Sequence, residues 1–443
     1  MASSSFPEHL CVLVHGLWGN PNHLNHLRDT LQAQQTDERL NIFLPKSNAD
    51  SFTYDGIEVG GERITNEIEQ KIKELEHNGA KIKKISLTGY SLGGLVARYA
   101  IGLMYRNGLF DNVEPINFTT FATPHLGIKT PKKGYRSLIW DFMGARTLSV
   151  SGQQMFLIDK FRDTGRPLLS ILADENSIFM KGLNRFKNKT LYANTQNDRS
   201  VPYFTSSINC TDPFVDLDKI DIHYLPDQDD PVILDPSTPV SPRKAPKEPS
   251  TGSRGFTLMS PQTRAALPFY AIFFSLFPLV LPAYLINSVI QTYKSTQRVQ
   301  HHESGLAGIN LGRYRIPLLE EVQATQDRAL RRIASNSEQE FLPTPPPEEA
   351  SPSVSTASLG TQSRKPMSRR KSVRQADSPF PILALSDEQF EMMDSLNEVG
   401  FTKFPVHIQR HRHTHAAIVV RIQKESFDEG RVVVTHWAER FEV

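Results

Sequence analysis

The sequence has little cysteine and almost no net charge, and each shortage excludes a class of protein. Only Cys11 and Cys210 occur among 443 residues, so a secreted scaffold held by disulfides is excluded and a reducing compartment is expected. The 50 Lys and Arg residues nearly balance 48 Asp and Glu residues, which argues against nucleic acid as a partner because phosphate binding needs a basic excess. The opening MASSSFPEHL has no basic stretch followed by an apolar one, so no secretory signal is predicted.

Composition divides the chain into zones. Residues 8–225 alternate short apolar runs with helical patterns, which is typical of βαβ units around a mostly parallel sheet. Residues 226–262 are rich in Pro, Asp and Ser and are predicted to be a disordered linker. An apolar segment at 265–290 follows. A second disordered linker, basic and rich in proline, is predicted over 340–378, before a compact C-terminal part at 380–443.

The strongest chemical signal is the run GYSLGG, which starts at Gly89 between a strand-like run and a helical one. A serine nucleophile in a strand-to-helix turn needs small residues two before it and two after it, because larger side chains would collide there. Gly89 and Gly93 meet this need around Ser91. The start of the following helix would also place N–H groups beside the reacting carbon. The pattern predicts that Ser91 is a nucleophile, and the alternative is an inert serine in a glycine-rich turn.

A serine hydrolase of this type also needs two backbone donors for the oxyanion of its tetrahedral intermediate. One donor is the amide of the residue after the nucleophile, which here is Leu92. The second is expected from the loop HGLWG at 15–19, which follows the first strand-like run. Gly16 lets the backbone turn the amide of Leu17 toward the site. His15 is interpreted as a structural residue of this loop.

Serine at neutral pH is a weak nucleophile, so a histidine base and an orienting carboxylate are required, in the chain order Ser, acid, His. Asp198 is predicted as the acid because it lies on a polar turn after an apolar run, and the alternative is an aspartate that only stabilises the turn. Among 14 histidines, His415 is preferred because it lies where a polar loop meets an apolar run. His413 is second and His223 third. No metal site is predicted from the H-x-H-x-H run, since no cysteine or acidic ligand accompanies it.

Several segments together resemble the serine-esterase and lipase family of fungi and plants, with the closest likeness to fungal lipid-droplet phospholipases. The likeness covers about residues 8–225 and 380–440 and rests on LVHGLWGNPNHL, SLTGYSLGGLVARYA, FATPHLGI, SGQQMFLID, YANTQNDRSVPYFTS and HTHAAIVVR. It implies an α/β-hydrolase fold, action on acyl esters of lipids, and a triad of Ser91, Asp198 and His415.

The segment 265–290 carries no charged residue and has basic flanks. As a helix it would reach roughly 39 Å, enough to cross the hydrocarbon core of a bilayer. If Asp198 and His415 share one site, however, both ends of the segment must lie on the same side of the membrane. We therefore expect a membrane-embedded hairpin, or a helix lying flat in the interface. Three prolines, with Pro278 near the middle, favour a break in the helix.

An apolar patch within residues 128–160 interrupts the series of strand-like runs. We predict that it forms a cap over the active site, with Trp140 and Phe142 binding acyl chains. The alternative is a helix that simply covers the sheet.

The sequence thus predicts a serine lipase or phospholipase at the cytosolic face of a membrane or lipid droplet, attached through residues 265–290. Its reaction would be hydrolysis of fatty acyl esters of glycerophospholipids through an acyl-enzyme on Ser91, with no metal or organic cofactor. Within the enzyme class, the alternatives are a neutral-lipid lipase and an acyltransferase. From a different class, the alternative is a non-catalytic membrane tether that has kept the fold.

Overall fold

The computed structural model describes residues 6–35, 39–131, 147–226, 228, 230–243, 261–315 and 379–443, with only the backbone for 261–277. The predicted cap residues Trp140 and Phe142 lie outside the described residues.

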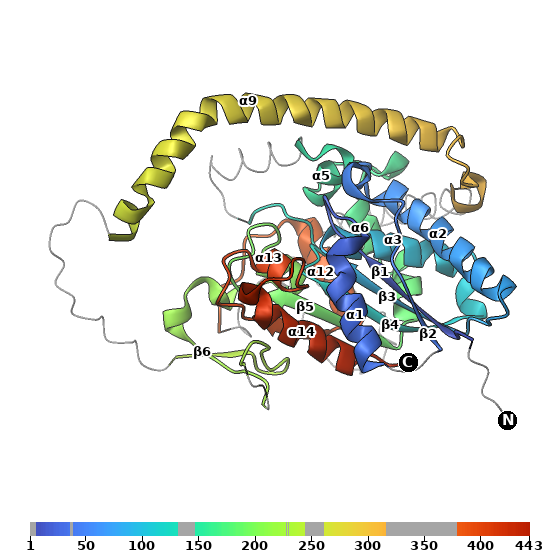
Figure 1. Ribbon diagram of the computed structural model, residues 1–443, viewed down its shortest axis with the longest axis horizontal. Coiled ribbons are helices and arrows are strands. Elements are labelled where there is room, and N and C mark those ends of the chain that lie inside the picture. Colours follow the sequence, from blue (N-terminus) through green and yellow to red (C-terminus); the bar gives the residue numbers. More distant parts are fainter. Residues whose placement is uncertain are drawn as a thin grey trace, which may run out of the picture.

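A six-stranded parallel sheet forms the centre of the protein (Figure 1). Its spatial order is β2 (Leu40–Phe43), β1 (His9–Val14), β3 (Lys84–Tyr90), β4 (Glu114–Phe121), β5 (Asn188–Asn194) and β8 (Thr402–Val406). Every neighbouring pair is parallel, so the predicted parallel sheet is confirmed. Because β8 pairs with β5, the C-terminal part of the chain completes the sheet that the N-terminal part begins. Two short strands, β6 (Ile220–Ile222) and β7 (Val240–Pro242), form a separate antiparallel pair.

Helices cover both faces of the sheet. On one face lie α2 (Ile57–His77), α3 (Leu92–Arg106) and α7 (Ile178–Asn184), and on the other lie α1 (Asn25–Gln34) and α14 (Asp428–Glu439). The other α-helices of the described residues are α5 (Ser149–Met155), α6 (Leu168–Leu172), α8 (Tyr203–Ser206), α9 (Pro261–Glu303), α12 (Asp387–Glu398) and α13 (Thr414–Ala417).

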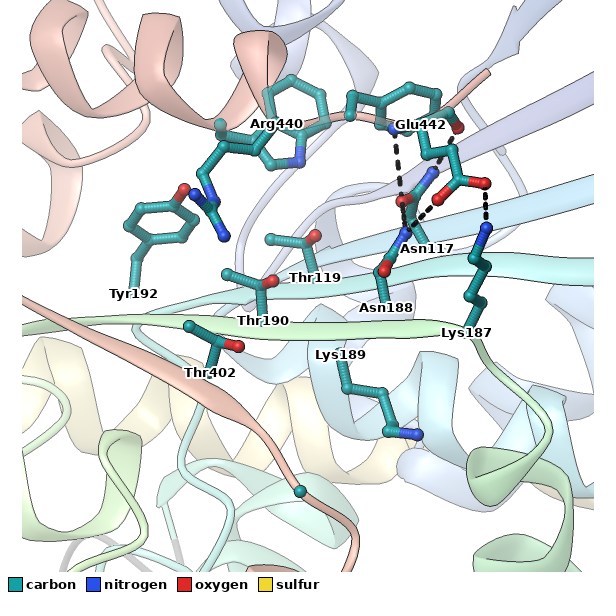
Figure 2. Close-up of a pocket in the computed structure, with 13 residues that line it drawn as sticks. Asn117, Thr119, Lys187, Asn188, Lys189, Thr190, Tyr192, Thr402, Arg440 and Glu442 are labelled. Atoms are coloured by element: carbon teal, nitrogen blue, oxygen red, sulfur yellow. Dashed lines mark hydrogen bonds and ion pairs between the residues drawn. The ribbon is translucent and has the colours of Figure 1, made fainter. Parts of the chain in front are cut away.

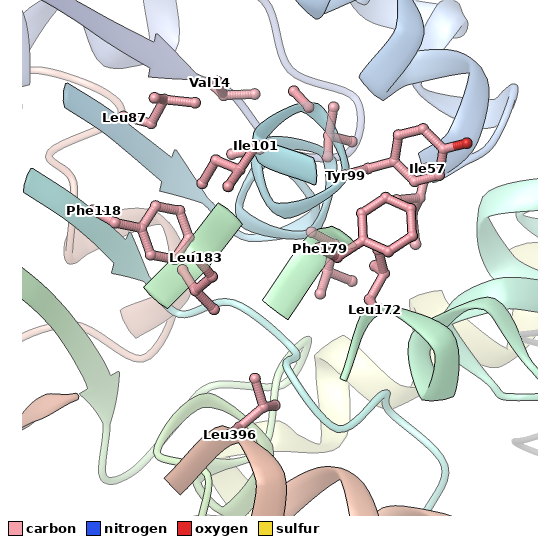
Figure 3. Close-up of a cluster of buried hydrophobic side chains, with 14 of the residues drawn as sticks. Val14, Ile57, Leu87, Tyr99, Ile101, Phe118, Leu172, Phe179, Leu183 and Leu396 are labelled. Carbon is pink, nitrogen blue, oxygen red and sulfur yellow. The ribbon is translucent and has the colours of Figure 1, made fainter. Parts of the chain in front are cut away.

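Strand β1 shows why both faces are covered. Leu10, Val12 and Val14 face the core under α2 and α3, whereas Cys11 and Leu13 face the core under α1 and α14. A strand with apolar side chains on both sides must be buried on both sides. Figure 3 shows part of the first core, where side chains of the sheet meet those of α3. Because helices cover both faces of the sheet, a functional site is expected in the loops at the ends of the strands.

The prediction of a linker over 226–262 is wrong for part of that range. Val232, Ile233 and Leu234 are buried, and the Leu234 amide donates a hydrogen bond to the carbonyl oxygen of Pro405 at 2.9 Å. Strand β8 is at the edge of the sheet, so it has unpaired backbone groups that such a segment can use. Three consecutive apolar side chains next to a free strand edge are enough to fix a segment whose overall composition is polar.

The apolar segment is part of one continuous helix, α9, and the predicted hairpin is wrong. Figure 1 shows α9 as a long curved helix that crosses one side of the domain and extends past it. Proline removes a backbone donor and clashes with the preceding turn, and here the result is curvature and not a chain reversal. Over the residues that the structure describes, no helix combines the length and the apolar character needed to span a membrane. The alternative of a helix lying flat on a lipid surface stays a prediction.

Candidate active site

Three side chains predicted from distant parts of the sequence meet at the carboxyl ends of parallel strands. Ser91 follows β3, Asp198 follows β5, and His415 lies on α13, beyond β8. Nε2 of His415 is 2.9 Å from Oγ of Ser91, and Nδ1 of His415 is 2.8 Å from Oδ2 of Asp198. These contacts form one chain of hydrogen bonds from a carboxylate through an imidazole to a hydroxyl, which is the geometry that activates a serine for nucleophilic attack.

The turn that carries Ser91 is strained and depends on glycine. Ser91 has φ 55° and ψ −129°, a conformation that non-glycine residues rarely adopt. A Cβ atom at position 89 would lie 2.4 Å from Cα of Gly94, and one at position 93 would lie 2.3 Å from the carbonyl oxygen of Val14. The need for small residues around the serine, predicted from the motif, is therefore confirmed by the packing.

The loop at 15–19 lies against the nucleophile, since a Cβ atom at Gly16 would come within 2.7 Å of Cβ of Ser91. In the described part of the chain, the amides of Leu17 and Leu92 have no hydrogen-bond acceptor. Leu92 begins α3, and the first amides of a helix have no acceptor within it. Two donors therefore remain free beside Ser91. His15 is buried and contacts the Gly16 carbonyl through Nδ1, a structural position in this loop.

The Asp198 carboxylate is held ionised inside the protein. Its side chain is 2% exposed, and it accepts hydrogen bonds from Asn194 Nδ2 at 2.9 Å and from the Val201 amide at 2.8 Å. Burial by itself raises the pKa of Asp198, but the charge and hydrogen bond of His415, with those two further donors, outweigh it and hold the pKa below its usual value. The acid is thus available as an anion to orient the imidazole.

Two supporting contacts were not predicted from the sequence. Tyr90 donates its hydroxyl hydrogen to the carbonyl oxygen of His415 at 2.8 Å. Thr414 donates its hydroxyl hydrogen to the carbonyl oxygen of Gln196 at 2.8 Å, which joins α13 to the turn of Asp198. Tyr90 occupies the variable position of the serine motif, and in both contacts the partner is more than 200 residues away. No local pattern marks such residues.

The two competing histidines lie elsewhere. The ring of His413 packs against that of His411 at 5.7 Å, and Nε2 of His223 contacts Oγ of Ser241 at 2.9 Å beside the β6–β7 pair. Of the histidines that the structure describes, His415 is the one within hydrogen-bond distance of Ser91. Within the same described ranges, no cluster of three or more His, Cys, Asp or Glu residues is arranged to hold a metal ion.

The loop at 15–19 is fastened to the short helix η2 (Asp50–Tyr54). The amide of Trp18 donates a hydrogen bond to Oγ1 of Thr53 at 3.1 Å, and its indole Nε1–H donates to the hydroxyl of Tyr54 at 2.7 Å. Trp18 has a positive φ of 53°, so its backbone conformation is unfavourable by itself. Contacts with η2 therefore keep this loop in the shape that faces Ser91.

Helix α9 is joined through buried charges to the same end of η2 that holds Trp18. Asp55, which ends η2, forms ion pairs with Arg63 at 2.9 Å and with Arg298 of α9 at 2.7 Å. Ser295 of α9 donates a further hydrogen bond to Asp55 at 2.7 Å. The Asp55 side chain is fully buried. The apolar helix is therefore linked, through η2, to the loop beside the nucleophile.

Comparison with known proteins gives relatives that are named as putative lipases. The chain is 32% identical over 239 residues to "Putative lipase ROG1" of Saccharomyces cerevisiae, covering 53% of this chain and 33% of that protein. It is 36% identical over 208 residues to "Putative lipase YDL109C" of the same yeast, covering 45% of this chain and 30% of that protein. The matched part thus spans about a third of the length of these curated relatives.

Among solved structures, a "Lipase-esterase related protein" from Clostridium acetobutylicum ATCC 824 aligns over 32% of this chain and 51% of its own, with 16% identity and a TM-score of 0.22. This likeness is too slight to carry an argument, and the fold rests on the strand order and pairing given above. The profile of the family described as "Putative serine esterase (DUF676)" matches residues 4–211 of the chain.

Proposed function

We propose that this protein is a serine lipase that hydrolyses fatty acyl esters of glycerophospholipids at the cytosolic surface of a membrane or lipid droplet. The observation that carries the reaction type is the chain of hydrogen bonds from Asp198 through His415 to Ser91. The match of residues 4–211 to the serine esterase family supports ester hydrolysis. The relatives named putative lipases support a lipid as the ester.

The reaction follows from the three side chains. Oγ of Ser91 forms a bond to the acyl carbonyl carbon while Nε2 of His415 accepts the hydroxyl proton. The same nitrogen then gives this proton to the oxygen of the leaving alcohol as the ester C–O bond breaks. A water molecule repeats the sequence on the acyl-enzyme, which releases a free fatty acid and restores Ser91. Throughout, the ionised Asp198 stabilises the imidazolium and fixes its orientation.

The oxyanion of each tetrahedral intermediate needs donors that are already in place. We assign this role to the free amides of Leu17 and Leu92, which flank the nucleophile. Such donors contribute little to binding of the neutral ester and much more to the charged intermediate, so they accelerate the chemical step.

Exposed apolar side chains support the proposed contact with lipid. Ile286 and Val289 of α9 are 61% and 69% exposed, and Trp18 in the loop beside Ser91 is 50% exposed. Exposed apolar side chains on a helix and beside an active site are typical of contact with a membrane or an apolar substrate. We call the side chains on the helix the α9 surface; they are Leu279, Val280, Tyr284, Leu285, Ile286, Val289, Ile290 and Tyr293.

The proposed activity is tested with purified full-length protein and Ser91→Ala. Wild type is expected to be labelled by a fluorophosphonate probe and to release fatty acid from phosphatidylcholine liposomes, because both reactions need the activated Ser91 hydroxyl. Ser91→Ala should do neither. Fatty acid release is measured in parallel on triacylglycerol emulsions.

Each result of this experiment is decisive. Faster release from triacylglycerol than from phospholipid would show that the proposed substrate class is wrong. If wild type is neither labelled nor active on either lipid, the enzyme proposal fails and the protein is better explained as a membrane tether.

The lipid contact is tested separately, by flotation with phosphatidylcholine and phosphatidylserine liposomes. The triple variant Ile286→Asp, Val289→Asp and Tyr293→Asp is expected to stay in the bottom fraction while wild type floats, because charge at these positions opposes insertion among acyl chains. Val215→Asp is the matched control, since Val215 is 79% exposed but belongs to the short helix η5 (Pro213–Val215) and not to α9. Flotation of the triple variant equal to that of wild type would exclude the α9 surface as the attachment site. Fluorophosphonate labelling shows that each variant is folded.

A further inference from the structure

A cavity lies at the opposite end of the sheet from Ser91. It has a volume of about 260 Å³ and lies between the first residues of β5 and β8 and the end of α14 (Figure 2). Asp198 follows the carboxyl end of β5, whereas Thr190 lines the cavity four residues before that strand ends. These four residues correspond to roughly 13 Å of extended chain. The cavity is therefore separate from the site that contains the nucleophile.

Its floor is a row of hydroxyl groups. Thr119 of β4 is in register with Thr190 of β5, which is in register with Thr402 of β8. Neighbouring strands are about 4.8 Å apart, so the three threonines form a short polar ladder. Figure 2 shows all three on the side of the sheet that faces Arg440. In the described part of the chain, their hydroxyl groups make no hydrogen bond to other protein atoms.

The carboxylate and side-chain amide oxygens in this cavity already have donors. The Glu442 carboxylate accepts from Lys187 Nζ at 2.5 Å and from Asn188 Nδ2 at 2.9 Å. Oδ1 of Asn117 accepts from Asn188 Nδ2 at 3.1 Å. The hydrogen bonds from Lys187 and Asn188 lower the pKa of Glu442, so this carboxylate stays ionised and neutralises Lys187.

Besides the threonine hydroxyls, two nitrogen donors of this cavity lack a hydrogen-bonded or ion-paired partner among the described residues. Trp437 is 2% exposed and lines the cavity, and its Nε1–H has no partner among the described residues. A buried donor without an acceptor is costly. Arg440 also lines the cavity, and its guanidinium lies over the Phe404 ring at 5.1 Å without an ion pair to a described carboxylate. Lys189 does not contribute, because it donates to the Phe186 carbonyl on the other side of the sheet (Figure 2).

We propose that this cavity binds the carboxylate or phosphate group of a small molecule. A guanidinium and an indole N–H both require acceptors, and an oxyanion offers several acceptors in one group while neutralising Arg440. The threonine ladder would hold further polar atoms of the same molecule. A volume of 260 Å³ exceeds the space of one water molecule and lies just below that of sites for drug-sized ligands. This inference does not depend on the proposed lipase activity.

The test is isothermal titration calorimetry of the full chain with inorganic phosphate, glycerol phosphate, acetate and, as the neutral match, glycerol. Phosphate or acetate is expected to bind in the millimolar range or tighter, and glycerol is not. Arg440→Gln should weaken binding about tenfold or more, because it removes a charged donor. Trp437→Phe should weaken it as well while keeping an aromatic ring in the core. Stronger binding of glycerol phosphate than of phosphate would support a role for the threonine ladder.

Arg431→Gln on the same helix is the matched control, since Arg431 pairs with Asp428 and does not line the cavity. Ser91→Ala should bind as wild type does, which separates this site from the active site. Arg440 is exposed, so its variant is expected to fold, and melting curves verify this for all variants. Failure of every anion to bind in the millimolar range, or equal binding by Arg440→Gln and wild type, would overturn the proposal.

Discussion

Replacing His415 by alanine is expected to lower kcat by about 10⁴-fold or more, with little change in stability. Without the imidazole, 2.9 Å from Oγ of Ser91, no group accepts the hydroxyl proton or returns it to the leaving alcohol. The His415 side chain is partly exposed, so its removal leaves no large cavity. The measurement is kcat on a short water-soluble ester, which avoids any dependence on lipid binding, together with the rate of fluorophosphonate labelling.

The chain offers matched controls for this prediction. His413→Ala and His223→Ala also remove one imidazole each, but these rings contact His411 and Ser241 and not Ser91. Both variants should keep kcat within a few-fold of wild type. A loss of activity in His223→Ala, combined with a nearly active His415→Ala, would show that the base is assigned to the wrong residue.

The parts of this site that could be predicted from the sequence are those with local causes. The turn at Ser91 needs glycine at 89 and 93 because backbone atoms approach within 2.4 Å of the Cβ positions there. The six-residue motif GYSLGG is enough to predict that need. Asp198 could be chosen because it follows a strand-like run, and parallel strands bring such positions to one edge. His415 could be chosen because it lies where a polar loop meets an apolar run.

The rest depends on contacts between distant segments, which composition does not reveal. Residues 232–234 are buried on β8, although their neighbours in sequence have the composition of a linker. Proline in the apolar segment indicated a break, yet α9 is continuous through Pro278. In the same way, nothing near Asp55 or Arg298 in the sequence shows that these residues, 243 positions apart, form a buried ion pair.

That ion pair leads to the second large effect. Asp55→Asn is expected to lower the free energy of unfolding by about 3 kcal/mol, because breaking a buried pair leaves the remaining charges without compensation. Arg63 and Arg298 would both lose the carboxylate that now lies 2.9 and 2.7 Å from them. The measurement is chemical denaturation followed by circular dichroism. Arg313→Gln is the control, since the Arg313 side chain is half exposed in its pair with Glu69 and pairs with an exposed partner contribute about 1 kcal/mol or less.

The same substitution should also affect the reaction, because Asp55 ends the helix whose Thr53 and Tyr54 hold Trp18. At a temperature where Asp55→Asn is still folded, kcat on a soluble ester is expected to fall while KM changes little, since the Leu17 amide interacts mainly with the charged intermediate. A purely structural role for Asp55 would reduce the amount of folded enzyme and leave kcat per folded molecule unchanged. Titrating active sites with the fluorophosphonate probe separates these two possibilities. An unchanged kcat per labelled site would refute the link between α9 and the loop at 15–19.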